Sequence, residues 1–343
     1  MSRHTLPVSL RVACLALLLG PAQALATATG LARVDATATA VVPATNWTDS
    51  AIVTDGTPQS LSHDILQTLN GVTKPVVQVR ATADWDPGQL HVGARVEFPG
   101  VYVCTPFCNG VGTVQGSAHA VATTGADDID FSGMSGPTNI TLDVTGVVAS
   151  LFDWIDGTTF QSYQQSGSAY DRTVSVSFGL SQLQPSDCEG TPCIRPRQLT
   201  GGSLQLTQHY DGTTAFTSSG FVNAPSSWSN GTHQLISQDF TPLPSSPGVL
   251  FLSIETTVPT QYSHSGGDHI LASLDFGNTF GLTTNGPVFA LDPGETVNSA
   301  SLGLVDNHFT PVPEPATALV FGVGLTALAA RRQWIPRMRI GSP

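Results

Sequence analysis

The chain has 343 residues, enough for one large domain or two small ones. Only 11% of them are charged, against the roughly 25% that is usual in soluble globular proteins, whereas 40% are hydrophobic. Acidic residues outnumber basic residues by 25 to 13, so the formal charge is −12. This excess of negative charge excludes nucleic acid as a partner, because few side chains remain to neutralise phosphate. The apolar content excludes wholesale disorder.

Residues 1–26 have the order of parts of a secretory signal peptide. Arg3 and Arg11 provide a basic start, and the apolar run over 12–19 is too short to span a bilayer. A Gly-Pro pair then breaks the run, and small residues lead up to Ala26 at the spacing that signal peptidase reads. We therefore expect signal peptidase to remove residues 1–26 and the remainder to be exported.

Residues 27–311 form the predicted ectodomain. Between 27 and 312 there are seven basic and 24 acidic side chains, a formal charge of −17. Such a charge keeps a protein soluble and repels anionic surfaces. Residues 27–58 are mostly Ala, Thr, Val and Asp with little periodicity, which predicts a poorly ordered lead-in.

Two stretches have the spacing of short helices. Apolar residues at 61, 65, 66 and 69 are followed by Asn70-Gly71, a C-cap signal. Apolar residues at 144, 147, 148, 151, 152 and 155 step by three and one, which is also helical spacing. We therefore expect one or two short helices that pack against the remainder of the ectodomain.

Most of the ectodomain alternates apolar and polar residues with the period of two of a half-buried strand. The alternation is clearest over 90–98, 140–144, 174–180, 204–206 and 270–276. Turn formers such as Pro87-Gly88 and Pro293-Gly294 separate these runs. The pattern predicts an all-β fold, an antiparallel β-sandwich or jelly roll. The segment 184–197, rich in Pro and Cys, interrupts it, and we interpret this segment as an insertion in one domain.

Four cysteines follow the signal peptide, in two local pairs: Cys104 with Cys108, and Cys188 with Cys193. An even number in an exported chain favours disulfides, and local pairing would staple two loops. The spacing also fits a four-thiolate zinc site, and pairing between the two loops stays open. An oxidising compartment favours the disulfides.

Asp127, Asp128 and Asp130 place three carboxylates close together. Oxygen-rich loops bind calcium, so these residues are candidates for a calcium site, although their spacing matches no complete EF-hand. We predict no other cofactor or metal. The carboxylate pair Asp84 and Asp86 is of the kind that glycoside hydrolysis uses, but any acidic β-protein contains such pairs by chance. Since no Gly-x-Ser-x-Gly motif is present either, we predict no catalytic residue and no enzyme.

Near the end of the chain a proline-rich break, an apolar stretch and an arginine pair follow one another: Pro313, Glu314, Pro315, residues 316–330, Arg331 and Arg332. As a helix the apolar stretch would be about 22 Å long, which is short for a comfortable membrane span. The arginines would keep residues 333–343, a basic tail, on the cytoplasmic side. We therefore predict a single hydrophobic helix that anchors the chain to the inner membrane for a limited time.

This order of parts, over residues 312–332, resembles the PEP-CTERM sorting signal. The resemblance implies recognition by an exosortase, a membrane enzyme similar to transpeptidases, which cuts near Pro313, Glu314 and Pro315. It implies transfer to the surface or extracellular matrix of a Gram-negative bacterium, in association with exopolysaccharide or biofilm. The tail after the arginine pair is longer than in the family pattern.

We therefore predict an exported, non-enzymatic structural protein that is processed by signal peptidase and exosortase and contacts extracellular polysaccharide. Two other hypotheses stay open. The first is a carbohydrate-binding module in which tryptophans stack on sugar rings, with these candidates: Trp47, Trp85, Trp154 and Trp228. The second is a secreted hydrolase.

Overall fold

The computed structural model of the chain describes the following residues: 28–40, 45–54, 57–69, 71–99, 113–148, 171–188, 191–209, 213–244, 246–263 and 270–310. These residues form strands, turns and irregular connections, and no helix is found among them. The predicted all-β fold is confirmed.

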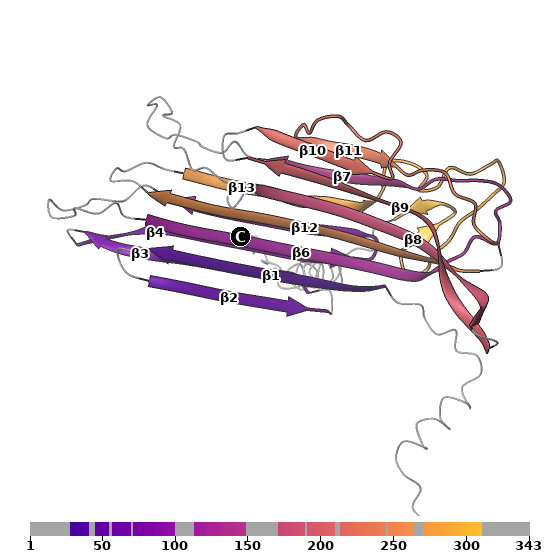
Figure 1. The fold of residues 1–343 in the computed structure, drawn as a ribbon, viewed down its shortest axis with the longest axis horizontal. Helices are drawn as coiled ribbons and strands as arrows, with labels where there is room; N and C mark the ends of the chain where they lie inside the picture. The colour runs from indigo at the N-terminus through magenta and orange to yellow at the C-terminus, as the bar shows by residue number, and fades with distance from the viewer. Residues whose placement is uncertain are drawn as a thin grey trace, which may run out of the picture.

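Two antiparallel sheets pack face to face as a sandwich, with the strands along its long axis (Figure 1). Sheet A has seven strands in the order β10 (Thr214–Ser219), β9 (Thr191–Gln208), β8 (Arg172–Cys188), β12 (Gly248–Ser263), β6 (Thr113–Ile129), β1 (Thr29–Ala40) and β2 (Thr45–Val53). Sheet B has six, in the order β11 (Gly231–Ile236), β7 (Thr141–Val148), β13 (Ile270–Leu282), β5 (Gln89–Phe98), β4 (Val72–Asp86) and β3 (Gln59–Leu69). A small hairpin joins β14 (Leu304–Val305) to β15 (His308–Phe309).

The predicted short helices are wrong wherever the structure describes them. Residues 59–69 form β3, and Gly71, with φ of +78°, lies in the tight turn to β4 instead of capping a helix. Residues 141–148 form β7, in which Val144 is buried while Val147 is 45% exposed. Val147 on the outer face lies three residues after Val144, which is why the spacing resembled that of a helix. The rest of that predicted helix, after residue 148, lies outside the described residues.

The predicted lead-in over 27–58 is also wrong, because most of it forms β1 and β2 of sheet A. Strand β1 does alternate, with its inward positions at Ala32, Val34, Ala36, Ala38 and Ala40. In the second half of the strand alanine contrasts little with Thr37 and Thr39 between the inward positions, so the period of two is hard to see there.

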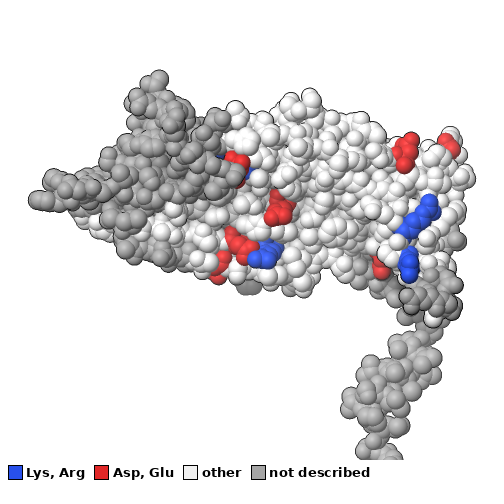
Figure 2. All heavy atoms as spheres, in the orientation of Figure 1, with Lys and Arg blue, Asp and Glu red and all other residues white. Residues whose placement is uncertain are grey.

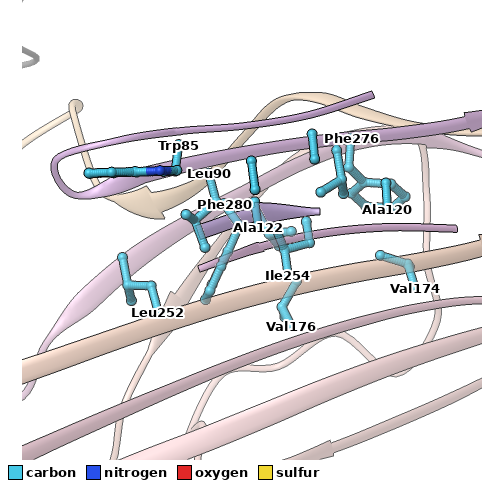
Figure 3. Packing of buried hydrophobic residues seen from close by; sticks show 14 of the residues in the cluster. Trp85, Leu90, Ala120, Ala122, Val174, Val176, Leu252, Ile254, Phe276 and Phe280 are labelled. Carbon is cyan, nitrogen blue, oxygen red and sulfur yellow. The ribbon is translucent and has the colours of Figure 1, made fainter. Parts of the chain in front are cut away.

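Small side chains fill the space between the two sheets at the centre of the sandwich. Strands β1 and β6 turn seven alanines inward: Ala32, Ala36, Ala38, Ala40, Ala118, Ala120 and Ala122. Strands β4 and β5 pack against them with short side chains: Val77, Val79, Ala81, Ala83, Val92, Ala94 and Val96. Figure 3 shows Ala120 and Ala122 within the larger cluster, which also contains Ile254, Leu252 and Phe280. The two sheets therefore approach closely here.

The two ends of the sandwich differ in what they hold. We call them the Gly88 end and the Gly71 end, after the turns that join β4 to β5 and β3 to β4. At the Gly88 end β1 begins, β6 ends and β13 ends, as the strand registers show. A Cβ atom on Gly30 would lie 2.3 Å from the Trp85 ring, and one on Gly88 would lie 3.0 Å from the Phe309 ring. Both ends of the described chain therefore lie at the Gly88 end.

We predict that Gly116→Val destabilises the protein by about 1–3 kcal/mol, the usual cost of overpacking a core. A Cβ on Gly116 would lie 2.4 Å from Cγ1 of Val96 across the sandwich. The matched control is Gly179→Val in β8, where nothing lies within 4 Å of an added Cβ. Urea unfolding followed by tryptophan fluorescence measures both. Equal stability of the two variants would contradict close packing at Gly116.

Candidate functional site

The residues predicted for sorting lie outside the described part of the chain: Pro313, Glu314, Pro315, Arg331 and Arg332. The structure does show what they are attached to. The last described residue, Thr310, donates its backbone N–H to the carbonyl of Gly303 over 3.2 Å, and the preceding Phe309 is buried. The folded ectodomain thus extends to within three residues of Pro313.

A buried asparagine fixes the hairpin that ends the ectodomain. Asp306 and Asn307 form its turn with φ of 46° and 64°, the left-handed values that tight hairpins need. The Asn307 side chain is 6% exposed; its Nδ2 donates to the carbonyl of Phe289, and its Oδ1 accepts from the Phe289 N–H, each over 2.7 Å. Its backbone N–H bonds to the carbonyl of Val297 over 2.8 Å. The last strand pair is therefore tied to residues 289–297.

Asp128, at the end of β6, holds the neighbouring connection. Its carboxylate accepts hydrogen bonds from the hydroxyls of Ser299 and Ser301 and, over 2.9 Å, from the Ser301 N–H. Burial raises the pKa of Asp128, but the hydrogen bonds from Ser299 and Ser301 outweigh it, so this pKa is lowered overall. The ionised carboxylate therefore stabilises the folded loop over 299–303.

The three candidate calcium ligands do not converge on one point. Asp127 is exposed, Asp128 bonds to Ser299 and Ser301, and Asp130 accepts the N–H of Ser132 over 2.8 Å in its own turn. No group of three or more His, Cys, Asp or Glu is placed to hold a metal ion within the part of the chain that the structure describes. The carboxylates of Asp128 and Asp130 instead accept hydrogen bonds within the connections at the Gly88 end.

We predict that Asp128→Asn lowers the free energy of unfolding at neutral pH by about 1–3 kcal/mol, since it removes a charged acceptor from three donors. A lowered folded pKa means that the contribution of Asp128 is present above the usual carboxyl pKa and is lost as the pH falls through the folded value. The free energies of unfolding of wild type and variant should therefore approach each other in acid. Urea unfolding at neutral pH and at about pH 3 tests this. Asp127→Asn is the control, and a difference that is independent of pH would contradict the assignment.

The second cysteine pair lies at the tip of a hairpin. Strands β8 and β9 continue through the segment 184–197, where Cys188 is paired with Thr191 and Ser186 with Cys193. Cys193 is disulfide-bonded, but the side chain of Cys188 is outside the described ones, so their pairing stays a prediction. Cys104 and Cys108 also lie outside the described residues. The segment 184–197 is thus the end of a hairpin of sheet A.

The tryptophan side chains that the structure describes lie in the core or pack against it. Trp85 is buried beside Gly30, and the Trp228 ring packs 5.5 Å from the Phe276 ring and 4.4 Å from the His233 ring, centroid to centroid. Trp85 is therefore not available to stack on a sugar ring, whereas Trp228 is only partly buried and its stacking role stays a hypothesis. The side chains of Trp47 and Trp154 lie outside the described ones.

A short row of charged side chains crosses the outer face of sheet A. Arg33 Nε bonds to Asp35 Oδ2 over 2.7 Å, and the His119 ring lies between Asp35 and Glu255, at 3.1 and 2.8 Å from their oxygens. Burial raises the pKa of Asp35, but bonds from Arg33 and His119 outweigh it and lower this pKa overall. Figure 2 shows that charged atoms are sparse on this view of the molecule. Sequence reasoning did not predict this row, because its members come from three strands, and Asp35 and His119 are 84 residues apart.

Arg172 is a buried cation at the start of β8. It is 4% exposed and shares the inward face of β8 with Val174 and Val176. Its guanidinium donates to Gln208 Oε1 over 3.4 Å, and its Nε has no hydrogen-bond partner among the described residues. Burial lowers the pKa of Arg172 to about 10.

We predict that Arg172→Met stabilises the protein at neutral pH, by at most roughly 3 kcal/mol, because an unbranched apolar side chain replaces the arginine stem and the cost of a buried charge is removed. A lowered folded pKa of a base means that this cost is full below about pH 10 and falls as the folded state loses its proton first. Above this pH the free energy of unfolding of wild type should therefore rise relative to that of the variant. Urea unfolding between neutral pH and about pH 11 measures the difference. A difference in unfolding free energy that does not change with pH, or a large loss of stability in Arg172→Met, would contradict a net cost of burying the Arg172 charge.

Comparison with known families gives one match. The model of the PEP-CTERM protein-sorting motif matches residues 311–333, which begin directly after the last described residue, Thr310. No curated protein is significantly similar to the chain. In the described ranges no helix is long and apolar enough to cross a membrane, and the predicted C-terminal helix falls outside them. This chain is thus one that carries a PEP-CTERM protein-sorting motif, at residues 311–333.

Proposed function

We propose that this chain is a structural protein of the cell surface or extracellular matrix, which exosortase processes at Pro313, Glu314 and Pro315. The motif at 311–333 carries the proposal, because a PEP-CTERM motif supports exosortase-dependent sorting to the cell surface. Signal peptidase first removes residues 1–26. The apolar residues 316–330 then anchor the chain in the inner membrane of a Gram-negative bacterium until the cut releases or transfers the ectodomain.

The outer face of sheet A supports a place in a polysaccharide matrix. Five hydroxyl residues lie directly opposite one another across β6, β12, β8, β9 and β10: Thr123, Ser253, Ser177, Ser203 and Ser219. The last two hydroxyls lie 3.0 Å apart. Hydroxyl groups donate and accept hydrogen bonds, as those of a polysaccharide do, and they carry no charge. We propose that this face contacts neutral exopolysaccharide and has no catalytic role.

We predict that replacing Pro313, Glu314 and Pro315 with alanine leaves the chain unprocessed. In a host with an active exosortase, wild type should lose the residues after the cut and reach the surface fraction, whereas the variant should keep them and stay in the membrane fraction. Mass spectrometry of the C-terminal peptide, with immunoblots of both fractions, measures this. The matched control replaces Arg337 and Arg339, which lie beyond the motif, and should be processed as wild type is.

Two results would contradict the proposed function. One is equal processing of wild type and the alanine variant in the same host. The other is a wild-type chain that stays intact in the membrane when the exosortase is active.

A further inference from the structure

We propose that the Gly88 end of the sandwich faces the membrane and the exosortase until the cut, and that the Gly71 end points away from both. This inference rests on the proposed function. It adds the surface of the ectodomain that the processing enzyme must approach.

The first argument is the short reach between the folded body and the cut site. Phe309 packs against the turn at Gly88, and Thr310 bonds to Gly303. Three residues of extended chain span at most about 10 Å, so Pro313 lies no farther than this from Thr310. An enzyme that cuts near Pro313 must therefore work directly beside the Gly88 end.

The second argument comes from the other end of the chain. Strand β1 begins at Thr29, beside Trp85 at the Gly88 end, three residues after the predicted signal-peptide cut behind Ala26. The same reach of about 10 Å applies there. Both predicted processing sites are thus joined to the same end of the sandwich by short connections. Because signal peptidase acts first, the C-terminal connection alone then holds the Gly88 end toward the membrane.

The third argument is that the Gly88 end is a fixed obstacle. Its connections are bonded to one another through their backbones: Asp130 to Asn298, over 2.8 Å, and Thr138 to Phe240, over 2.7 and 2.8 Å. Glu295 accepts bonds from the N–H and hydroxyl of Ser135, over 2.6 and 2.7 Å. Bulk added to this end cannot be moved aside by unfolding one loop without breaking these bonds, so it should hinder the enzyme.

Two glycines provide a matched test. Gly294 lies in an exposed turn of the Gly88 end, and Gly71 lies in the exposed turn at the other end. They have φ of 92° and 78°, and an added Cβ would meet nothing within 4 Å at either. A small, independently folding domain inserted after Gly294 or after Gly71 therefore adds the same bulk at opposite ends.

In a host with an active exosortase, we expect the insertion after Gly294 to slow C-terminal processing roughly tenfold or more, and the insertion after Gly71 to leave it as in wild type. A flexible Gly/Ser linker of about 12 residues after Thr310 should restore processing of the Gly294 variant, because it adds a reach of roughly 20 Å. Thermal unfolding of the purified variants checks that both insertions leave the sandwich folded.

The outcomes separate this inference from the proposed function. Equal processing of the two insertion variants overturns the orientation while exosortase processing stands. A block at Gly294 in a folded variant that the linker does not relieve also overturns it, because the obstacle is then not steric. If the alanine variant of the motif is processed like wild type, the proposed function itself fails.

Discussion

The close approach of the two sheets between β1 and β6 on one side and β4 and β5 on the other is the constraint on which the rest of the fold depends. Packed sheets usually lie about 10 Å apart, and side chains of both must fit in that space. Here one side supplies single methyl groups, so valine suffices on the other side. Where even a methyl would collide, as at Gly116 against Val96, the chain has glycine.

Larger side chains also form a cluster away from this centre. Phe131, Phe240 and Phe289 pack edge to face beyond the ends of their strands, with ring centroids 5.6 to 6.5 Å apart. They lie under the connections of the Gly88 end. That end is thus closed by aromatic packing and then by polar side chains such as Asp128 and Asn307, which bond to the backbone of the loops above.

The sequence predicts the strands well where large apolar residues alternate with polar ones. Leu90 to Phe98 and Val174 to Leu180 are examples, and both form strands with those residues buried. It predicts poorly where alanine takes the inward positions, as in β1, or where an apolar residue such as Val147 lies on the outer face. Hydropathy depends on the type of a side chain and not on the face of the strand to which it points. Both kinds of error have this cause.

The sorting motif is predictable because its signal is local and contiguous, and the family match to 311–333 confirms it. The hydrogen bonds that hold the connections of the adjoining Gly88 end cannot be predicted in this way. The partners of Asp128 are 171 and 173 residues away in the chain, and those of Asn307 include Phe289 in a different connection. The short spacing of Asp127, Asp128 and Asp130 suggested calcium ligands. Only the folded chain shows that the hydroxyls of Ser299 and Ser301 donate hydrogen bonds to Asp128.

The pairing of strands from the two ends of the described chain also sets the order in which the sheets can be completed. The pairing of β1 with β6, and of β13 with β5, brings together segments far apart in the sequence. Closing such loops costs entropy that grows slowly with loop length. Sheet B therefore cannot be completed until the chain has been synthesised through β13.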